Sequence, residues 1–325
     1  MTLILTTVWH GGVSQVADRQ VSRQVRPGQF ESFDPDANKT VLFAASDAFV
    51  TISYSGPAYI EGSPTDEWIA AKLRGRPIDR GPDGVRPAAI SGGRVPDWPR
   101  MRDALQRLTE AIDTVVSRLG RPALESFYLG VAIAGWILRR RKRPRAFGQV
   151  VCWRGDSRSP VITRSPRHFL EESRFWLVIE PDGYMSNDEG NELVRAFMTA
   201  VRDPDAAEQA VIAGLRRVAL RRTGVVGPHC MCMLLPPPRI GWARVRFDSL
   251  GPQRVAVAHS RDSVVVPVAF SPWVVTQDQT LAPATVSGGP LTVPIGPWEL
   301  RIESPTLPNS GIRALHFSQQ RRPAP

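Results

Sequence analysis

The first 21 residues contain two runs rich in apolar and β-branched side chains, as two short β-strands would. Residues 2–9 are mostly β-branched or apolar, the pair Gly11-Gly12 interrupts them, and residues 13–21 resume the pattern. A glycine pair permits the tight turn that joins two antiparallel strands. The opening of the chain therefore predicts a β-hairpin.

The rest of the first 235 residues predicts strands and helices in alternating groups. Clusters of β-branched and aromatic residues predict strands at 39–55 (a pair with a turn near 46–47), 128–138, 146–153, 175–179 and 229–235. Apolar residues three or four positions apart predict helices at 66–75, 101–119, 188–201 and 205–222. Thr65-Asp66 is expected to cap the first of these helices. The polar stretches 23–38 and 75–97, which contain Pro and Gly, predict loops.

The order of these elements predicts the fold class. Strands, two helices, strands, two helices and a strand follow one another, which favours a layered α/β or α+β fold over a doubly wound sheet. Pro236-Pro237-Pro238 marks a predicted boundary, and residues 236–325 contain only short β-type runs separated by turns. We therefore expect a domain over residues 1–235 and an all-β C-terminal extension over 236–325, with a disordered RRPAP tail.

The basic composition changes this picture little. The sequence has 41 Lys and Arg against 31 Asp and Glu, a net charge of +10. Such an excess of positive charge could bind nucleic acid. The charges are scattered along the chain, however, and nearly all are arginine, which a compositional bias of the genome would also explain. The densest run, RRRKRPR at 139–145, has no interleaved aromatic residues on which bases would stack. We expect it to be a hairpin tip, and a nucleic-acid partner is not expected.

The chain also lacks the signals of a membrane or secreted protein. No run of about 18 apolar residues occurs, so no transmembrane helix is predicted, and the N-terminus has no basic segment followed by a long apolar one. Three cysteines are an odd and low number that suits a reducing compartment. We expect a cytoplasmic protein with no membrane contact.

The run His229-Cys230-Met231-Cys232 is the strongest candidate for a metal site. Side chains alternate between the two faces of a strand, so both cysteines would face one side and His229 the other. Buried thiols in a core strand are the expected outcome. The five histidines show no metal-ligand spacing, and no dinucleotide or phosphate-binding fingerprint occurs. Neither a metal nor a cofactor is expected.

Several residues near the start of the chain occur in the same order as in a known family. They are Thr2, Gly11-Gly12, Ala17-Asp18, Lys39 and Ser55-Gly56. This pattern, with an interval of sixteen positions from Thr2 to Asp18, resembles proteasome β-type subunits and related bacterial peptidase subunits, which are N-terminal nucleophile hydrolases. The resemblance is specific in motif over residues 2–70 and extends in element order to residue 235. It implies a four-layer αββα sandwich.

The same resemblance implies a catalytic site. Removal of Met1 would free Thr2, whose hydroxyl is the nucleophile and whose α-amine, with a reference pKa near 8, accepts the hydroxyl proton. Lys39 would hold the pKa of that amine down by like-charge repulsion, and Asp18 would orient Lys39. The backbone N–H of Gly56 would stabilise the oxyanion. The implied function is a threonine-type peptidase or amide hydrolase, assembled as a ring of copies, acting on a peptide or amide substrate.

Two features depart from the family pattern. The interval from Thr2 to Lys39 is several residues longer than usual, which lengthens the intervening loop. The family's later serine and aspartate have only the candidates Ser186 and Asp182, and the acidic residues around them, including Glu189, could equally cap the following helix. A catalytically inactive scaffold or binding subunit with the same fold stays an alternative, as does a weaker one, a basic protein associated with nucleic acid.

Overall fold

The chain folds into several β-sheets and helices. The computed structural model describes residues 2–26, 29–34, 37–78, 90–92, 94–138, 143–155, 161–164, 168–169, 175–179, 185–248, 268–270, 272–287, 291–295, 298–303 and 314–317. Five α-helices lie in this described part: α1 (Thr65–Arg74), α2 (Met101–Ser117), α3 (Arg121–Glu125), α4 (Asn187–Ala200) and α5 (Pro204–Arg221). The fold class is mixed α+β, as the order of the predicted elements indicates.

The first large sheet contains the N-terminal hairpin. Its strand order is β14 (Phe175–Ile179), β1 (Ile4–Trp9), β2 (Gly12–Asp18), β15 (Cys230–Leu235), β16 (Trp242–Asp248), β22 (Trp298–Glu303) and β21 (Leu291–Ile295). All neighbours pair antiparallel except β16 and β22, which are parallel. The hairpin predicted for the opening residues is confirmed, with Trp9 opposite Gly12 at its turn.

The second large sheet contains the hairpin predicted over residues 39–55. Its order is β12 (Val161–Arg164), β11 (Arg145–Arg154), β10 (Tyr128–Ile137), β6 (Ala48–Ser55), β5 (Thr40–Ala44), β18 (Trp273–Val275), β19 (Gln279–Leu281) and β9 (Ile90–Gly92), and β13 (His168–Phe169) also pairs with β11. Three small sheets complete the described strands: β3 (Val21–Arg26) with β4 (Gln29–Asp34), β7 (Tyr59–Ile60) with β8 (Ser63–Pro64), and β17 (Val268–Phe270) with β20 (Ala284–Ser287) and β23 (Ala314–Phe317).

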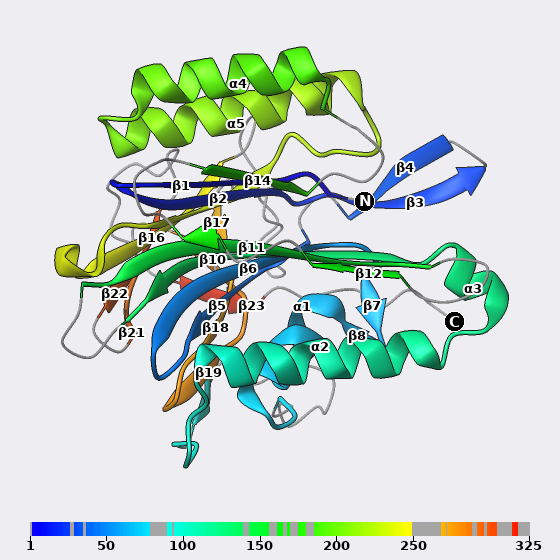
Figure 1. The fold of residues 1–325 in the computed structure, drawn as a ribbon, viewed down its shortest axis with the longest axis horizontal. Helices are drawn as coiled ribbons and strands as arrows, with labels where there is room; N and C mark the ends of the chain where they lie inside the picture. Colours follow the sequence, from blue (N-terminus) through cyan, green and yellow to red (C-terminus); the bar gives the residue numbers. More distant parts are fainter. Residues whose placement is uncertain are drawn as a thin grey trace, which may run out of the picture.

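The helices and sheets are stacked in layers (Figure 1). Helices α4 and α5 lie over the outer face of the first sheet, where Phe197 and Leu215 join a buried cluster with Cys232. Helices α1 and α2 lie over the outer face of the second sheet, in a cluster that includes Trp68, Leu108 and Val131. A third cluster, with Val13 and Met233 from the first sheet and Phe49 and Trp136 from the second, fills the space between the sheets. Each large apolar side chain buried in this way contributes roughly 1.5–3 kcal/mol.

Two local predictions are wrong. Residues 23–38 do not form only a loop, because β3 and β4 pair there as an antiparallel hairpin. Both strands carry charged and polar side chains, including the ion pair Arg23–Glu31, so they lack the one-sided apolar alternation that marks a strand. At the start of α1 the N-cap is Pro64 without a side-chain hydrogen bond, and the carboxylate of Asp66 is buried instead of capping the helix.

The strands after Pro236 are divided among three sheets. β16, β22 and β21 extend the first sheet, β18 and β19 extend the second, and β17, β20 and β23 form a sheet of their own. Most of the described residues after Pro236 lie in strands, with a 3₁₀ turn at Pro238–Ile240. The division of the chain at residue 235 stays a prediction. The RRPAP tail and residues 139–142 of the basic turn lie outside the described residues.

The two cysteines of the central strand β15 are buried, as predicted. Cys230 and Cys232 are both 0% exposed and face α4 and α5. Their sulfur atoms lie 3.8 Å apart, and burial raises the pKa of the Cys232 thiol well above its ordinary value. They act as small apolar side chains in the core.

Candidate functional site

The ends of two hairpins, one from each large sheet, meet at one place. In the first sheet Ile4 pairs with Ala17, and the backbone N–H of Asp18 donates to the carbonyl of Leu3 at 3.2 Å, so Thr2 lies beside Asp18. In the second sheet the N–H of Tyr54 donates to the carbonyl of Lys39 at 3.2 Å. Strand pairing therefore places the start of β1 beside the end of β2 and the start of β5 beside the end of β6, and the contact of Lys39 Nζ with Thr2 Oγ1 joins the two hairpins.

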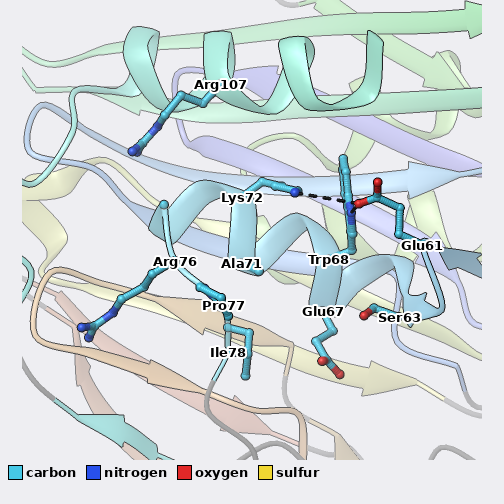
Figure 2. A pocket seen from close by; sticks show the side chains of 11 residues that line it. Glu61, Ser63, Glu67, Trp68, Ala71, Lys72, Arg76, Pro77, Ile78 and Arg107 are labelled. Carbon is cyan, nitrogen blue, oxygen red and sulfur yellow. Dashed lines mark hydrogen bonds and ion pairs between the residues drawn. The ribbon is translucent and has the colours of Figure 1, made fainter. Parts of the chain in front are cut away.

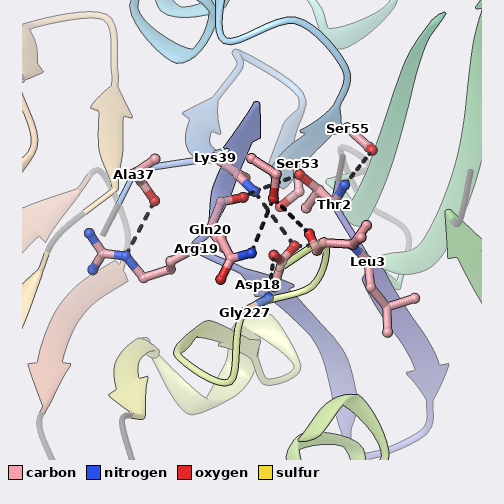
Figure 3. A network of polar contacts seen from close by, with 12 residues as sticks. Thr2, Leu3, Asp18, Arg19, Gln20, Ala37, Lys39, Ser53, Ser55 and Gly227 are labelled. Carbon is pink, nitrogen blue, oxygen red and sulfur yellow. Dashed lines mark hydrogen bonds and ion pairs between the residues drawn. The ribbon is translucent and has the colours of Figure 1, made fainter. Parts of the chain in front are cut away.

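Lys39 lies at the centre of this site (Figure 3). Its Nζ donates to the Oγ1 of Thr2 at 2.6 Å and lies 3.6 Å from Oδ1 of Asp18. The same ammonium donates to the backbone carbonyl of Gln20. Thr2, Asp18 and Lys39 are 2%, 0% and 4% exposed. Three of the four predicted site residues thus form one buried polar cluster.

Asp18 is held by two backbone donors in addition to Lys39. The N–H of Leu3 donates to Oδ1 at 3.0 Å, and the N–H of Gly227, from the segment between α5 and β15, donates to Oδ2 at 3.1 Å. A Cβ on Gly227 would lie 2.6 Å from the Cβ of Gln20, so this close approach needs a residue without a side chain. Hydrogen bonds from fixed backbone groups orient the carboxylate toward Lys39.

Burial changes the proton affinity of both charged groups. Burial lowers the pKa of Lys39 from its ordinary value, and the neighbouring Asp18 opposes this change. Burial likewise raises the pKa of Asp18, against the effects of Lys39 and of the N–H groups of Gly227 and Leu3. Because the Lys39 ammonium donates to Thr2 Oγ1, its positive charge is placed to favour an anion on that oxygen.

The end of β6 approaches the other side of Thr2. The backbone nitrogen of Thr2 donates to the Oγ of Ser55 at 3.0 Å, and Gly56 follows directly. Gly56 has a φ of 151°, and a Cβ there would lie 2.6 Å from the carbonyl oxygen of Tyr128. A side chain at this position would therefore clash with β10, whatever the role of the Gly56 N–H in catalysis.

The later serine candidate, Ser186, is not brought into this cluster. Ser186 is exposed and caps α4, where its Oγ accepts from the N–H of Glu189 at 3.2 Å and the Glu189 carboxylate accepts from the Ser186 N–H at 2.7 Å. Of the two interpretations of this segment, the helix cap is the one observed. Asp182 lies outside the described residues.

Three contributors to the site were not predicted as site residues. Ser55 belongs to the Ser55-Gly56 motif, but its hydroxyl had no assigned role. Gln20 acts through its backbone carbonyl and Gly227 through its backbone N–H. Backbone contacts of this kind have no side-chain signature, and Gly227 is 209 positions from Asp18.

A separate hollow lies beside α1 (Figure 2). It has a volume of about 600 Å³, and its lining includes Trp68, Arg76 and Arg107. Lys72 lies 4.9 Å from the centre of the Trp68 ring and 4.0 Å from the Glu61 carboxylate. None of the residues of the Lys39 cluster lines it.

The described ranges contain neither a cluster of metal-ligating side chains nor a membrane-spanning helix. No group of three or more His, Cys, Asp or Glu side chains is placed there to hold a metal ion. No described helix is both long enough and apolar enough to cross a membrane.

Comparisons with known proteins leave the family open. No family model matches the chain, and no curated protein matches its sequence. Among solved structures, Anbu (ancestral beta-subunit) from Yersinia bercovieri is similar to this chain with a TM-score of 0.37 and 12% identity, over 72% of this chain and 81% of that chain. A similarity this weak carries no argument about activity, which has to be inferred from the geometry of the site.

Proposed function

We propose that this chain is a threonine-type N-terminal nucleophile amide hydrolase, a proteasome-like peptidase that becomes active when Met1 is removed. The observation that carries the proposal is the contact of 2.6 Å between Lys39 Nζ and Thr2 Oγ1, inside a cluster that also holds the Asp18 carboxylate. A hydroxyl is a weak nucleophile unless a neighbouring group accepts its proton. After Met1 removal the free α-amine of Thr2 would accept that proton, and the Lys39 ammonium, which donates to the hydroxyl, would stabilise the oxygen anion that forms.

The reaction follows from the groups present. After Met1 removal, the Thr2 hydroxyl attacks the carbonyl carbon of an amide, and its proton passes to the free α-amine of Thr2, with Lys39 stabilising the developing Oγ anion. The carbon–nitrogen bond breaks as the amine leaving group takes up that proton. Water then attacks the resulting ester and releases the carboxylic acid and free Thr2. In this proposal Asp18 orients Lys39, and the N–H of Gly56 stabilises the oxyanion.

The proposed architecture extends to the layers and the assembly. The order of helices, two sheets and helices supports a four-layer αββα sandwich of the N-terminal nucleophile hydrolase type. Assembly into a ring of copies rests on the sequence resemblance alone. The sedimentation behaviour of the purified protein tests it.

The test of the function compares Thr2→Ala with Thr2→Ser. Both residues are small enough for an N-terminal methionine to be removed before them, but only serine keeps a hydroxyl. We expect the untagged protein to have a mass short by one methionine, to hydrolyse fluorogenic peptide amides and to acquire one equivalent of an electrophilic threonine-protease inhibitor. Thr2→Ala should lose both turnover and labelling, whereas Thr2→Ser should keep part of each. An active, folded Thr2→Ala variant would rule out this mechanism.

A second candidate function is a non-catalytic scaffold with the same fold. It is favoured by the burial of Thr2, whose residue surface is only 2% exposed, because a nucleophile must be reached by its substrate. A retained Met1 would support the scaffold, since a blocked Thr2 has no free amine. In a scaffold, neither the natural chain nor Thr2→Ala would turn over amides or react with the inhibitor.

A further inference from the structure

We propose that Ser55 is a positioning residue, whose hydroxyl orients the α-amine of Thr2. This inference rests on the proposed function and assigns a role to a residue adjacent to the oxyanion candidate Gly56. The contact that carries it joins the Thr2 backbone nitrogen to Ser55 Oγ at 3.0 Å (Figure 3).

Ser55 is rigidly placed for this role. It is the last residue of β6, it is 0% exposed, and its backbone pairs with Gly130 of the adjacent strand β10. Its neighbour Gly56 cannot carry a side chain without a clash against Tyr128. The hydroxyl therefore meets Thr2 from a fixed strand in the second sheet, while Thr2 itself belongs to the first sheet.

The contact restricts the direction of the amine that Met1 removal would create. In the chain that carries Met1, the Thr2 nitrogen is an amide with one hydrogen, which is donated to Ser55. A free amine can rotate about its bond to Cα, and its lone pair accepts the Oγ proton only in a limited range of rotation. If one N–H stays on Ser55 Oγ, the amine is confined near that range, as orientation effects in catalysis require.

Ser55 and Lys39 would act on the proton affinity of the amine in opposite directions. A hydroxyl that accepts a hydrogen bond favours the protonated ammonium, whereas the positive charge of Lys39 disfavours it. Loss of the Ser55 hydroxyl should therefore lower the pKa of the Thr2 amine as well as loosen its orientation. The first effect moves a pH profile, which a purely structural role of Ser55 would not do.

The experiment compares Ser55→Ala with Ser53→Ala in the full chain. Ser53 is a matched control because it is also 0% exposed, lies two residues earlier on β6 and uses its hydroxyl on Gln15 at 2.6 Å. We expect Ser55→Ala to lower kcat about tenfold, the rate equivalent of one hydrogen bond, and to move the acidic limb of kcat/KM to lower pH. Ser53→Ala should leave the position of that limb unchanged.

A second pair of variants covers the case in which Ser55→Ala does not fold. The side chains introduced by Ser55→Thr and Ser55→Val have nearly the same shape, and only threonine carries a hydroxyl. A lower kcat and a shifted acidic limb of kcat/KM in Ser55→Val, compared with Ser55→Thr, would support the proposal. Equal kcat and equal pH profiles in either pair overturn it. Because intact mass reports Met1 removal in every variant, a processing defect is recognised separately. An active Thr2→Ala variant would instead refute the proposed function itself.

Discussion

The chain buries charged side chains in two clusters that differ in their cation. In the first, Lys39 lies between Asp18 and the hydroxyl of Thr2. In the second, Glu208 of α5 is 0% exposed and accepts from Arg244 of β16 at 2.9 Å, with Arg246 at 3.5 Å. Burial raises the pKa of Glu208, and both arginines oppose that change.

The cation of each cluster determines whether the buried charge only stabilises the fold or can also take part in a reaction. An arginine keeps its proton under all conditions relevant to proteins, whereas a buried lysine can lose its proton. The Glu208 cluster therefore joins α5 to the first sheet without a group that exchanges protons readily with a nucleophile. The Lys39 cluster combines a cation of lowered pKa with a hydroxyl in direct contact. Only the second combination is suited to catalysis.

Replacing the cation of the Lys39 cluster should produce the largest loss of kcat. Lys39→Arg keeps a positive charge but replaces the compact ammonium that donates to Thr2 Oγ1 by a larger planar guanidinium, and it should lower kcat roughly 10²–10³-fold, the range for loss of one donor to a developing oxyanion. The reciprocal variant Arg244→Lys should keep kcat within about twofold and lose about 1–3 kcal/mol of unfolding free energy, since hydrogen bonds to buried carboxylates are lost. Steady-state kinetics and urea unfolding measure the two quantities.

Lys39→Met controls for the bulk of the guanidinium group. It keeps an unbranched side chain of similar length and removes the amine, so it should be as inactive as Lys39→Arg. If Lys39→Arg were folded and retained most of the wild-type kcat, the compact ammonium of Lys39 would not be needed at Thr2 and the distinction between the clusters would fail.

Gly227→Ala should have an intermediate effect. The added methyl group would lie 2.6 Å from Gln20 Cβ and displace the N–H that donates to Asp18. Loss of a hydrogen bond to a buried carboxylate should cost about 1.5–3 kcal/mol of unfolding free energy, and kcat should fall because Asp18 no longer orients Lys39. Gly120→Ala is the matched control, since a Cβ at Gly120 meets nothing within 4 Å. Equal stability and kcat in the two variants would mean that Gly227 does not hold the site.

The sequence predicted the part of this site that depends on local pattern. Apolar and β-branched runs separated by turn residues predicted the hairpins at 2–21 and 39–55, whereas the grouping of Thr2, Asp18 and Lys39 was implied by the family resemblance. The hairpin of β3 and β4 was missed because its strands are polar on both faces. Gly227 and the pairing of Trp273 with Val41 were not predictable, because contacts between distant segments leave no periodic signal in either segment.

Ser186→Ala should have the smallest effect and tests whether a second hydroxyl belongs to the site. Because the Ser186 hydroxyl caps α4 and accepts from the N–H of Glu189, its loss should cost about 1 kcal/mol of unfolding free energy. The values of kcat and KM should stay those of the unmodified protein. Ser186→Asp keeps a capping acceptor at the N-terminus of the helix and should restore the stability. A large loss of kcat in a stable Ser186→Ala variant would mean that this serine reaches Thr2 during turnover, and the buried Lys39 cluster would then be only part of the catalytic machinery.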